Sequence, residues 1–122
     1  MNRALLIEDE FLIRELAEAY LTDAGFEVTA ARDGNEALEV LAKTTDFDLL
    51  FTDVRMPGGI DGREVAERAK QMIPGLRIVY ATGYSDAADK LSACELCIEK
   101  PYTMSTLRRV LGELGFAEAG QA

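Results

Sequence analysis

Short apolar runs alternate with stretches of helical periodicity along the whole chain. Short apolar runs favour strands, and apolar residues spaced three and four apart favour helices. The runs that predict strands are Leu5-Leu6-Ile7, the alternating set Phe26, Val28 and Ala30, Leu49-Leu50-Phe51-Thr52, Ile78-Val79-Tyr80-Ala81 and Leu96-Cys97-Ile98. The stretches with helical spacing run from Leu12 to Tyr20, Ala37 to Leu41, Val65 to Ile73 and Met104 to Leu114, with a short polar segment from Ser85 to Leu91.

Helix boundaries are marked by residues that satisfy the backbone groups at helix ends. Asp33 and Asp61 each stand three residues before a glutamate, which is the spacing of an N-cap with its capping-box partner. Pro74-Gly75 follows the third helical stretch and predicts its end. In that third stretch, the residues expected to face the core are Val65, Ala66, Ala69, Met72 and Ile73.

Five strands, each followed by a helical segment, predict a parallel sheet with helices on both faces. Right-handed crossovers make this a doubly wound α/β fold, and we expect the strand order 2-1-3-4-5. The fourth helix is expected to be short or irregular, because only a short polar segment follows the fourth strand. A chain of 122 residues has the length of one domain. We expect that domain over residues 1–116 and a disordered tail over residues 117–122.

Charge and composition narrow the classes of partner and chemistry. The 22 acidic residues exceed the 13 basic ones, which gives a net charge of −9, and no basic stripe stands out along the chain. Direct binding to nucleic acid is therefore not expected. No apolar run approaches the ~18 residues of a membrane span, so we expect no membrane association and a cytoplasmic location. The lack of histidine excludes Ser-His-Asp triads and histidine zinc ligands.

Polar side chains stand where four of the five predicted strands end. Glu8 and Asp9 follow the first strand, Asp53 ends the third, Thr82 ends the fourth and Lys100 follows the fifth. Ligands of open α/β sheets bind at the carboxyl ends of the strands. In the order 2-1-3-4-5 the first and third strands are neighbours, so three carboxylates meet in one crevice. Their mutual repulsion requires a cation or raised pKa values, and hard oxygen ligands with an open side suit Mg²⁺.

These residues belong to five short motifs that carry a family resemblance. The motifs are Glu8-Asp9, Asp53 followed by Met56-Pro57 and Asp61-Gly62, Thr82-Gly83, and Lys100-Pro101. In this order and approximate spacing, from Arg3 to about Leu114, they resemble the receiver domain of two-component response regulators. The resemblance implies that Asp53 accepts a phosphoryl group from the phosphohistidine of a histidine kinase or histidine phosphotransfer protein. The resemblance implies that the chain is a phosphoacceptor and not an enzyme. It would assist its own phosphorylation and autodephosphorylation, and it would signal by binding a downstream protein target.

The resemblance also assigns the metal ligands. Asp9 and Asp53 would bind Mg²⁺ directly, the Arg55 carbonyl would be a third ligand, and Glu8 would act through water. The divalent charge would offset the carboxylate cluster and stabilise the transferring phosphoryl group.

Four further residues receive roles from the same resemblance. Lys100 would pair with one phosphoryl oxygen, and the Thr82 hydroxyl would donate to another. Pro101 would follow a cis peptide that aims Lys100 inward, and Gly83 would leave space for the phosphoryl group to enter.

Three features depart from the usual receiver pattern. The loop from Met56 to Gly62 is one residue longer, and Thr82 and Lys100 are only 18 positions apart. Cys97 stands on the fifth strand where most receivers have the aromatic residue that reports activation. We therefore expect the output face to be altered and the signal to pass through residues 85–93. Together these features resemble the atypical single-domain receivers of alphaproteobacteria.

Other functional classes stay open at this point. The chain can be an unphosphorylated receiver-like binding module, or a receiver excised from a larger regulator or hybrid kinase. A hydrolase of the aspartyl-phosphate type is disfavoured, because such enzymes place a second acid two residues after the nucleophile, where this chain has Arg55. Cys94 and Cys97 have thioredoxin-like spacing, but they enter a strand instead of opening a helix after one. We expect both thiols to be reduced.

Overall fold

One parallel sheet organises the chain in the computed structural model, which describes residues 2–54, 56, 60–83 and 95–116. Its strands are β1 (Asn2–Ile7), β2 (Phe26–Ala31), β3 (Leu49–Asp53), β4 (Arg77–Thr82) and β5 (Glu95–Glu99). They lie in the order β2-β1-β3-β4-β5, and every neighbouring pair is parallel. The predicted doubly wound α/β fold and its strand order are confirmed.

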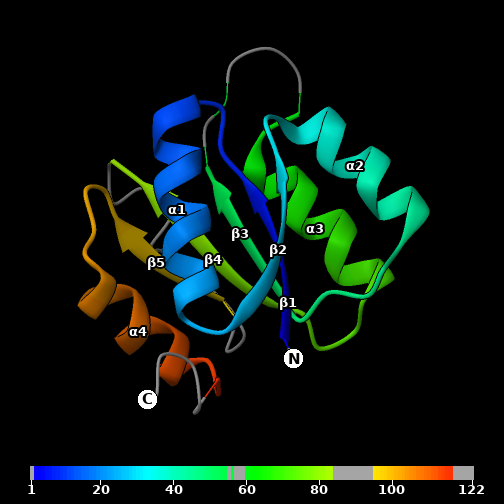
Figure 1. The fold of residues 1–122 in the computed structure, drawn as a ribbon. Coiled ribbons are helices and arrows are strands. Elements are labelled where there is room, and N and C mark those ends of the chain that lie inside the picture. Colours follow the sequence, from blue (N-terminus) through cyan, green and yellow to red (C-terminus); the bar gives the residue numbers. More distant parts are fainter. Residues whose placement is uncertain (1, 55, 57–59, 84–94, 117–122) are drawn as a thin grey trace.

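Helices cover both faces of this sheet (Figure 1). The described helices are α1 (Phe11–Asp23), α2 (Gly34–Lys43), α3 (Gly62–Met72) and α4 (Met104–Glu113). Buried residues of α1 and α4 pack with one face of the strands, and those of α2 and α3 pack with the other. The predicted short fourth helix and the tail over 117–122 lie outside the described residues. No helix in the described part of the chain is long and apolar enough to cross a membrane.

The central strand β3 has all five of its residues buried. A strand that is covered on both faces has a continuous apolar sequence instead of an alternating one. This explains why the run Leu49-Leu50-Phe51-Thr52 predicted a strand. Parallel pairing places Asp53 beside Ala81 of β4 and Ile7 beside Thr52. The sheet register therefore sets the ends of β1, β3 and β4 close together at one edge.

Two predicted helix starts are confirmed, and the prediction that Met72 faces the core is wrong. The carboxylate of Asp33 accepts a hydrogen bond from the Glu36 N–H at 2.8 Å, and that of Asp61 accepts one from the Glu64 N–H at 3.0 Å. Met72 was expected in the core, but it is 47% exposed. It is the last residue of α3, and the following residue, Ile73, packs against the core at this end of the helix.

Helix α1 has more apolar surface than the core can cover. Its buried residues are Ala17 and Leu21, whereas Phe11, Leu12 and Leu16 are 61%, 77% and 48% exposed. Leu12 and Leu16 belong to the periodic pattern that predicted this helix, so the pattern located the helix without identifying the face that packs. The exposed residues Phe11, Leu12 and Leu16 are called the α1 apolar strip below.

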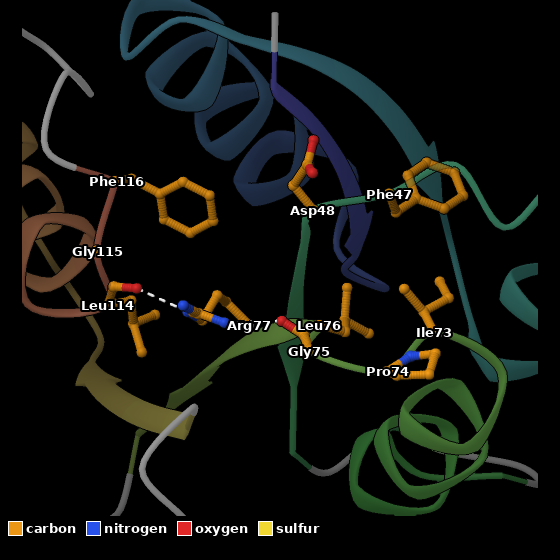
Figure 2. A pocket seen from close by; sticks show the side chains of 10 residues that line it. All are labelled: Phe47, Asp48, Ile73, Pro74, Gly75, Leu76, Arg77, Leu114, Gly115 and Phe116. Carbon is orange, nitrogen blue, oxygen red and sulfur yellow. Dashed lines mark hydrogen bonds between the residues drawn. The ribbon is translucent and has the colours of Figure 1, made fainter.

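At the amino edge of the sheet, Arg77 links two turns across a cavity of about 310 Å³ (Figure 2). Its Nε donates to the Leu114 carbonyl at 2.7 Å, and its Nη1 donates to the Gly75 carbonyl at 2.8 Å. Phe47 and Phe116 are also part of the cavity wall. Leu114 is the C-cap of α4, where a cation stabilises the carbonyl end of a helix.

Candidate functional site

The predicted polar residues that the structure describes meet in one cavity at the carboxyl edge of the sheet. It has a volume of about 260 Å³ and is lined by Glu8, Asp9, Glu10, Asp53, Ala81, Thr82, Gly83 and Lys100. Glu8, Asp53 and Thr82 are buried, whereas Asp9 is exposed. Arg55, whose carbonyl was expected as a metal ligand, lies outside the described residues. The topology of the sheet therefore brings together side chains from four different loops and strand ends.

Lys100 lies between two carboxylates that come from different strands. Its Nζ forms an ion pair with Glu8 Oε1 at 3.0 Å and a second, shorter one with Asp53 Oδ1. Its backbone N–H donates to the Thr82 carbonyl at 2.9 Å, which fixes its position next to the end of β4. The Lys100-Pro101 peptide bond is cis, as expected. Burial lowers the pKa of Lys100, but its hydrogen bonds with Asp53 and Glu8 outweigh burial, and the pKa is raised.

Asp53 is held in an environment that disfavours its charge. Burial, together with the negative charge of Glu8, raises its pKa from 3.8 to about 7, although the hydrogen bond with Lys100 acts in the opposite direction. One ammonium group is therefore insufficient to balance the two buried carboxylates. The remaining negative charge favours the arrival of a cation at this place.

Three carboxylates are close enough to share a metal ion. One oxygen each of Glu8, Asp9 and Asp53 lies within 4.8 Å of the others. Carboxylate oxygens are the ligands that Mg²⁺ prefers, and an exposed side of the site leaves room for its water ligands. The donor set and the excess of negative charge therefore fit Mg²⁺, with Asp9 on the open side.

The carboxylate of Glu8 is fixed from two directions. Oε1 pairs with Lys100, and Oε2 accepts a hydrogen bond from the Glu10 N–H at 3.1 Å. The Glu8 backbone N–H donates to the Ala31 carbonyl at the end of β2, at 3.1 Å. The predicted acidic pair therefore consists of two different groups, a buried and braced Glu8 and an exposed Asp9.

Gly62 has a structural role at this site that was not recognised in the sequence. A Cβ atom at this position would lie 1.7 Å from the Asp53 carbonyl oxygen. The Gly62 N–H donates to the Val54 carbonyl at 2.9 Å, so α3 begins directly against the end of β3. The Asp61-Gly62 pair was used as a helix start and as part of a motif, but Gly62 was given no role of its own, because a close approach between backbones leaves no periodic signal.

Tyr102 was also missed as a residue next to the acidic cavity. Its ring packs edge-to-face with Phe51 of β3 at 5.7 Å and with Tyr20 of α1 at 6.0 Å between centroids. Burial, followed by the charges of Glu8 and Asp53, raises the pKa of Tyr102. A mainly apolar cavity of about 300 Å³ beside it is lined by Ile13, Leu16, Lys100, Pro101 and Tyr102. Lys100 therefore borders both this apolar groove and the acidic cavity.

Comparisons with known proteins agree with one another. Residues 4–112 match the family model of the response regulator receiver domain. The response regulator receiver protein CpdR from Brucella abortus is 40% identical over 88 residues, which are 72% of this chain and 72% of CpdR. The crystal structure of a response regulator receiver protein from Sinorhizobium medicae matches with a TM-score of 0.84 at 33% identity, over 96% of both chains.

Other matches are to longer proteins or to complexes. The transcriptional regulator NtrC from Klebsiella pneumoniae is 38% identical over 90 residues, and the matched part is 19% of its length. TrrA from Thermotoga maritima, in complex with Mg²⁺–BeF, matches at 32% identity and a TM-score of 0.80, over 93% of this chain and 99% of that chain. A complex of the histidine kinase ThkA with TrrA matches at 31% identity and a TM-score of 0.78, over 94% of this chain and 99% of the matched chain.

Proposed function

Because this chain belongs to the family of response regulator receiver domains, we propose that Asp53 accepts a phosphoryl group from a phosphohistidine. In that transfer an oxygen of the Asp53 carboxylate forms a P–O bond as the P–N bond of the donor breaks. The electron pair of the broken bond stays on the histidine nitrogen. The observation that carries the proposal is the position of Asp53, which ends β3 in the acidic cavity and contacts Lys100.

The surrounding residues would support this step by electrostatics. Lys100 contacts Asp53 and would pair with a phosphoryl oxygen as negative charge develops on it. Thr82 lines the same cavity. Mg²⁺ held by Asp9 and Asp53, with Glu8 nearby, would neutralise charge on the transferring group. Hydrolysis of the phosphoaspartate at the same site would return the domain to its starting state.

The α1 apolar strip supports a docking surface for the phosphodonor, which we propose to be a histidine kinase or a histidine phosphotransfer protein. Leu16 borders the apolar groove, and Lys100 borders the groove and the acidic cavity. A partner that covers the strip and groove would therefore place its phosphohistidine beside Asp53. Replacing Leu12 and Leu16 by serine is expected to slow transfer from the kinase found by profiling purified kinases, and to leave phosphorylation by acetyl phosphate unchanged.

Intact mass spectrometry tests the phosphoacceptor. We expect acetyl phosphate and Mg²⁺ to add one acid-labile phosphoryl group to the wild type and to Asp48→Asn, an exposed aspartate at the other edge of the sheet. Asp53→Asn is expected to gain none, because it lacks the nucleophilic carboxylate. A wild type that gains no mass, or an Asp53→Asn variant that gains the same mass as the wild type, contradicts the assignment.

A further inference from the structure

We propose that Arg14 of α1 is a positioning residue for the acidic turn Glu8–Glu10, which joins β1 to α1 and carries the metal ligands. The inference rests on the proposed function, because it concerns Mg²⁺ binding and phosphoryl acceptance at that site. Arg14 would act through the backbone of the turn, with no contact to the phosphoryl group or the metal ion. Its role would be to hold Asp9 where a cation can bind.

Arg14 contacts the backbone on both sides of Asp9. Its Nη1 donates to the Glu8 carbonyl at 2.9 Å, and its backbone N–H donates to the Glu10 carbonyl at 2.8 Å. The second bond belongs to the first turn of α1, whereas the first requires the side chain to fold back past the start of the helix. The Arg14 side chain therefore restrains the peptide unit between Glu8 and Asp9, and the Arg14 backbone N–H restrains the Glu10 carbonyl on the other side of the predicted metal ligand.

The position of the Asp9 carboxylate depends on the backbone conformation more than the positions of the Glu8 and Asp53 carboxylates do. The carboxylates of Glu8 and Asp53 are buried and paired with Lys100. Within the described part of the chain, the exposed carboxylate of Asp9 has no hydrogen-bond or ion-pair partner of its own. Its distance from the other two carboxylates is therefore set by the conformation of the turn, which Arg14 restrains.

Phe11 gives the Arg14 side chain its position. The guanidinium carbon lies 5.5 Å from the centroid of the Phe11 ring, and that ring is 61% exposed. A planar guanidinium can stack on an aromatic ring while it donates from its edge, which an ammonium group does less well. The exposed Phe11 ring therefore helps to position the Arg14 guanidinium, besides being part of the α1 apolar strip.

A purely structural role for Arg14 makes a different prediction from a positioning role. If Arg14 only stabilised α1, its loss would lower the melting temperature and leave the Mg²⁺ affinity of the folded protein unchanged. If it positions the turn, its loss weakens Mg²⁺ binding even under conditions where the variant is fully folded. Replacing a residue that orients a metal ligand typically weakens metal affinity by about 10- to 100-fold.

The test is a titration of the full chain with Mg²⁺ alone. Calorimetry measures the Kd, and the NMR amide signals of Asp9 and Glu10 report binding at the turn. We expect Arg14→Ala to raise the Mg²⁺ Kd about 10-fold and Arg14→Lys to raise it less. Arg108→Ala is the matched control, because Arg108 also pairs with α1, through Asp23 at the far end of the helix. Its Kd should stay within about twofold of the wild type.

Phosphorylation by acetyl phosphate provides the second measurement. Arg14→Ala should react more slowly at low Mg²⁺ and recover when Mg²⁺ is raised, because its defect is in the metal affinity. A wild-type Kd in both Arg14 variants would overturn the positioning role, even if their melting temperatures fall. The absence of phosphorylation on Asp53 in the wild type would instead overturn the proposed function, so the two failures can be told apart.

Discussion

The two edges of the sheet each hold a long cation beside a cavity of similar volume, but the partners of the two cations differ. Arg77 at the amino edge donates to two neutral carbonyl oxygens, those of Leu114 and Gly75 (Figure 2). Lys100 at the carboxyl edge contacts two buried carboxylates, Glu8 and Asp53. Arg77 thus donates hydrogen bonds to two turns, whereas Lys100 is the one cation paired with these two carboxylates in the described part of the chain.

This contrast shows that cavity size does not distinguish the functional edge. The cavities measure about 310 Å³ at the amino edge and about 260 Å³ at the carboxyl edge. Their chemistry differs because the carboxyl ends of parallel strands collect the side chains of Glu8, Asp9 and Asp53 within 4.8 Å. Among the residues that the structure describes, the carboxylates at this edge outnumber the cations in contact with them, and this excess of negative charge favours a cation there.

The largest expected effect is on how stability depends on pH. Because the folded-state pKa of Asp53 is raised from 3.8 to about 7, the folded state keeps a proton that the unfolded state loses between about pH 4 and pH 7. The free energy of unfolding therefore falls as pH rises through this window, by an upper bound of roughly 4 kcal/mol from this group.

Urea unfolding in metal-free buffer at several pH values measures this effect as a difference between variants. Asp53→Asn should lose the decrease in stability, whereas Arg77→Ala should be less stable at every pH and keep the decrease. Parallel profiles for the wild type and Asp53→Asn would show that the carboxyl edge stores no excess charge.

The second effect is on the rate of phosphorylation. Lys100→Ala removes the ammonium group that contacts Asp53, and we expect the rate with acetyl phosphate to fall about 100-fold, which is typical for losing one group that stabilises developing charge. Arg77→Ala should keep the wild-type rate, since its guanidinium lies at the opposite edge. Initial rates from intact mass at saturating Mg²⁺ compare the two variants. An equal loss of rate in both would mean that the edges are not functionally distinct.

The smallest effect is on stability at the amino edge. Arg77→Ala leaves the Leu114 and Gly75 carbonyls without their side-chain donor, and we expect a loss of about 1–2 kcal/mol, because hydrogen bonds from charged groups are worth more than neutral ones. Arg77→Lys should lose part of this, because an ammonium group cannot span both carbonyls with the same geometry. Urea midpoints at pH 7 provide the measurement, and a stability unchanged in Arg77→Ala would remove the structural role given to this residue.

The sequence determined the five strands, the four helices that the structure describes and the described polar residues that gather at the carboxyl edge. Continuous apolar runs such as Leu49-Leu50-Phe51 that alternate with helical stretches favour a parallel sheet covered by helices on both faces, and that sheet is observed. In a parallel sheet the residue that follows a strand must lie at the carboxyl edge. Glu8, Asp53 and Lys100 could therefore be assigned to one cavity from their positions in the sequence.

Only the tertiary structure decided which apolar residues face the core and which polar groups touch. Leu12 and Ala17 both fit the apolar character of α1, but the position of the helix on the sheet buries Ala17 and exposes Leu12. Glu8 and Lys100 are 92 positions apart, so their ion pair depends on how β1, β3, β4 and β5 assemble. Local spacing reports periodicity along one segment, whereas these contacts arise from packing between segments, and no periodic pattern encodes that packing.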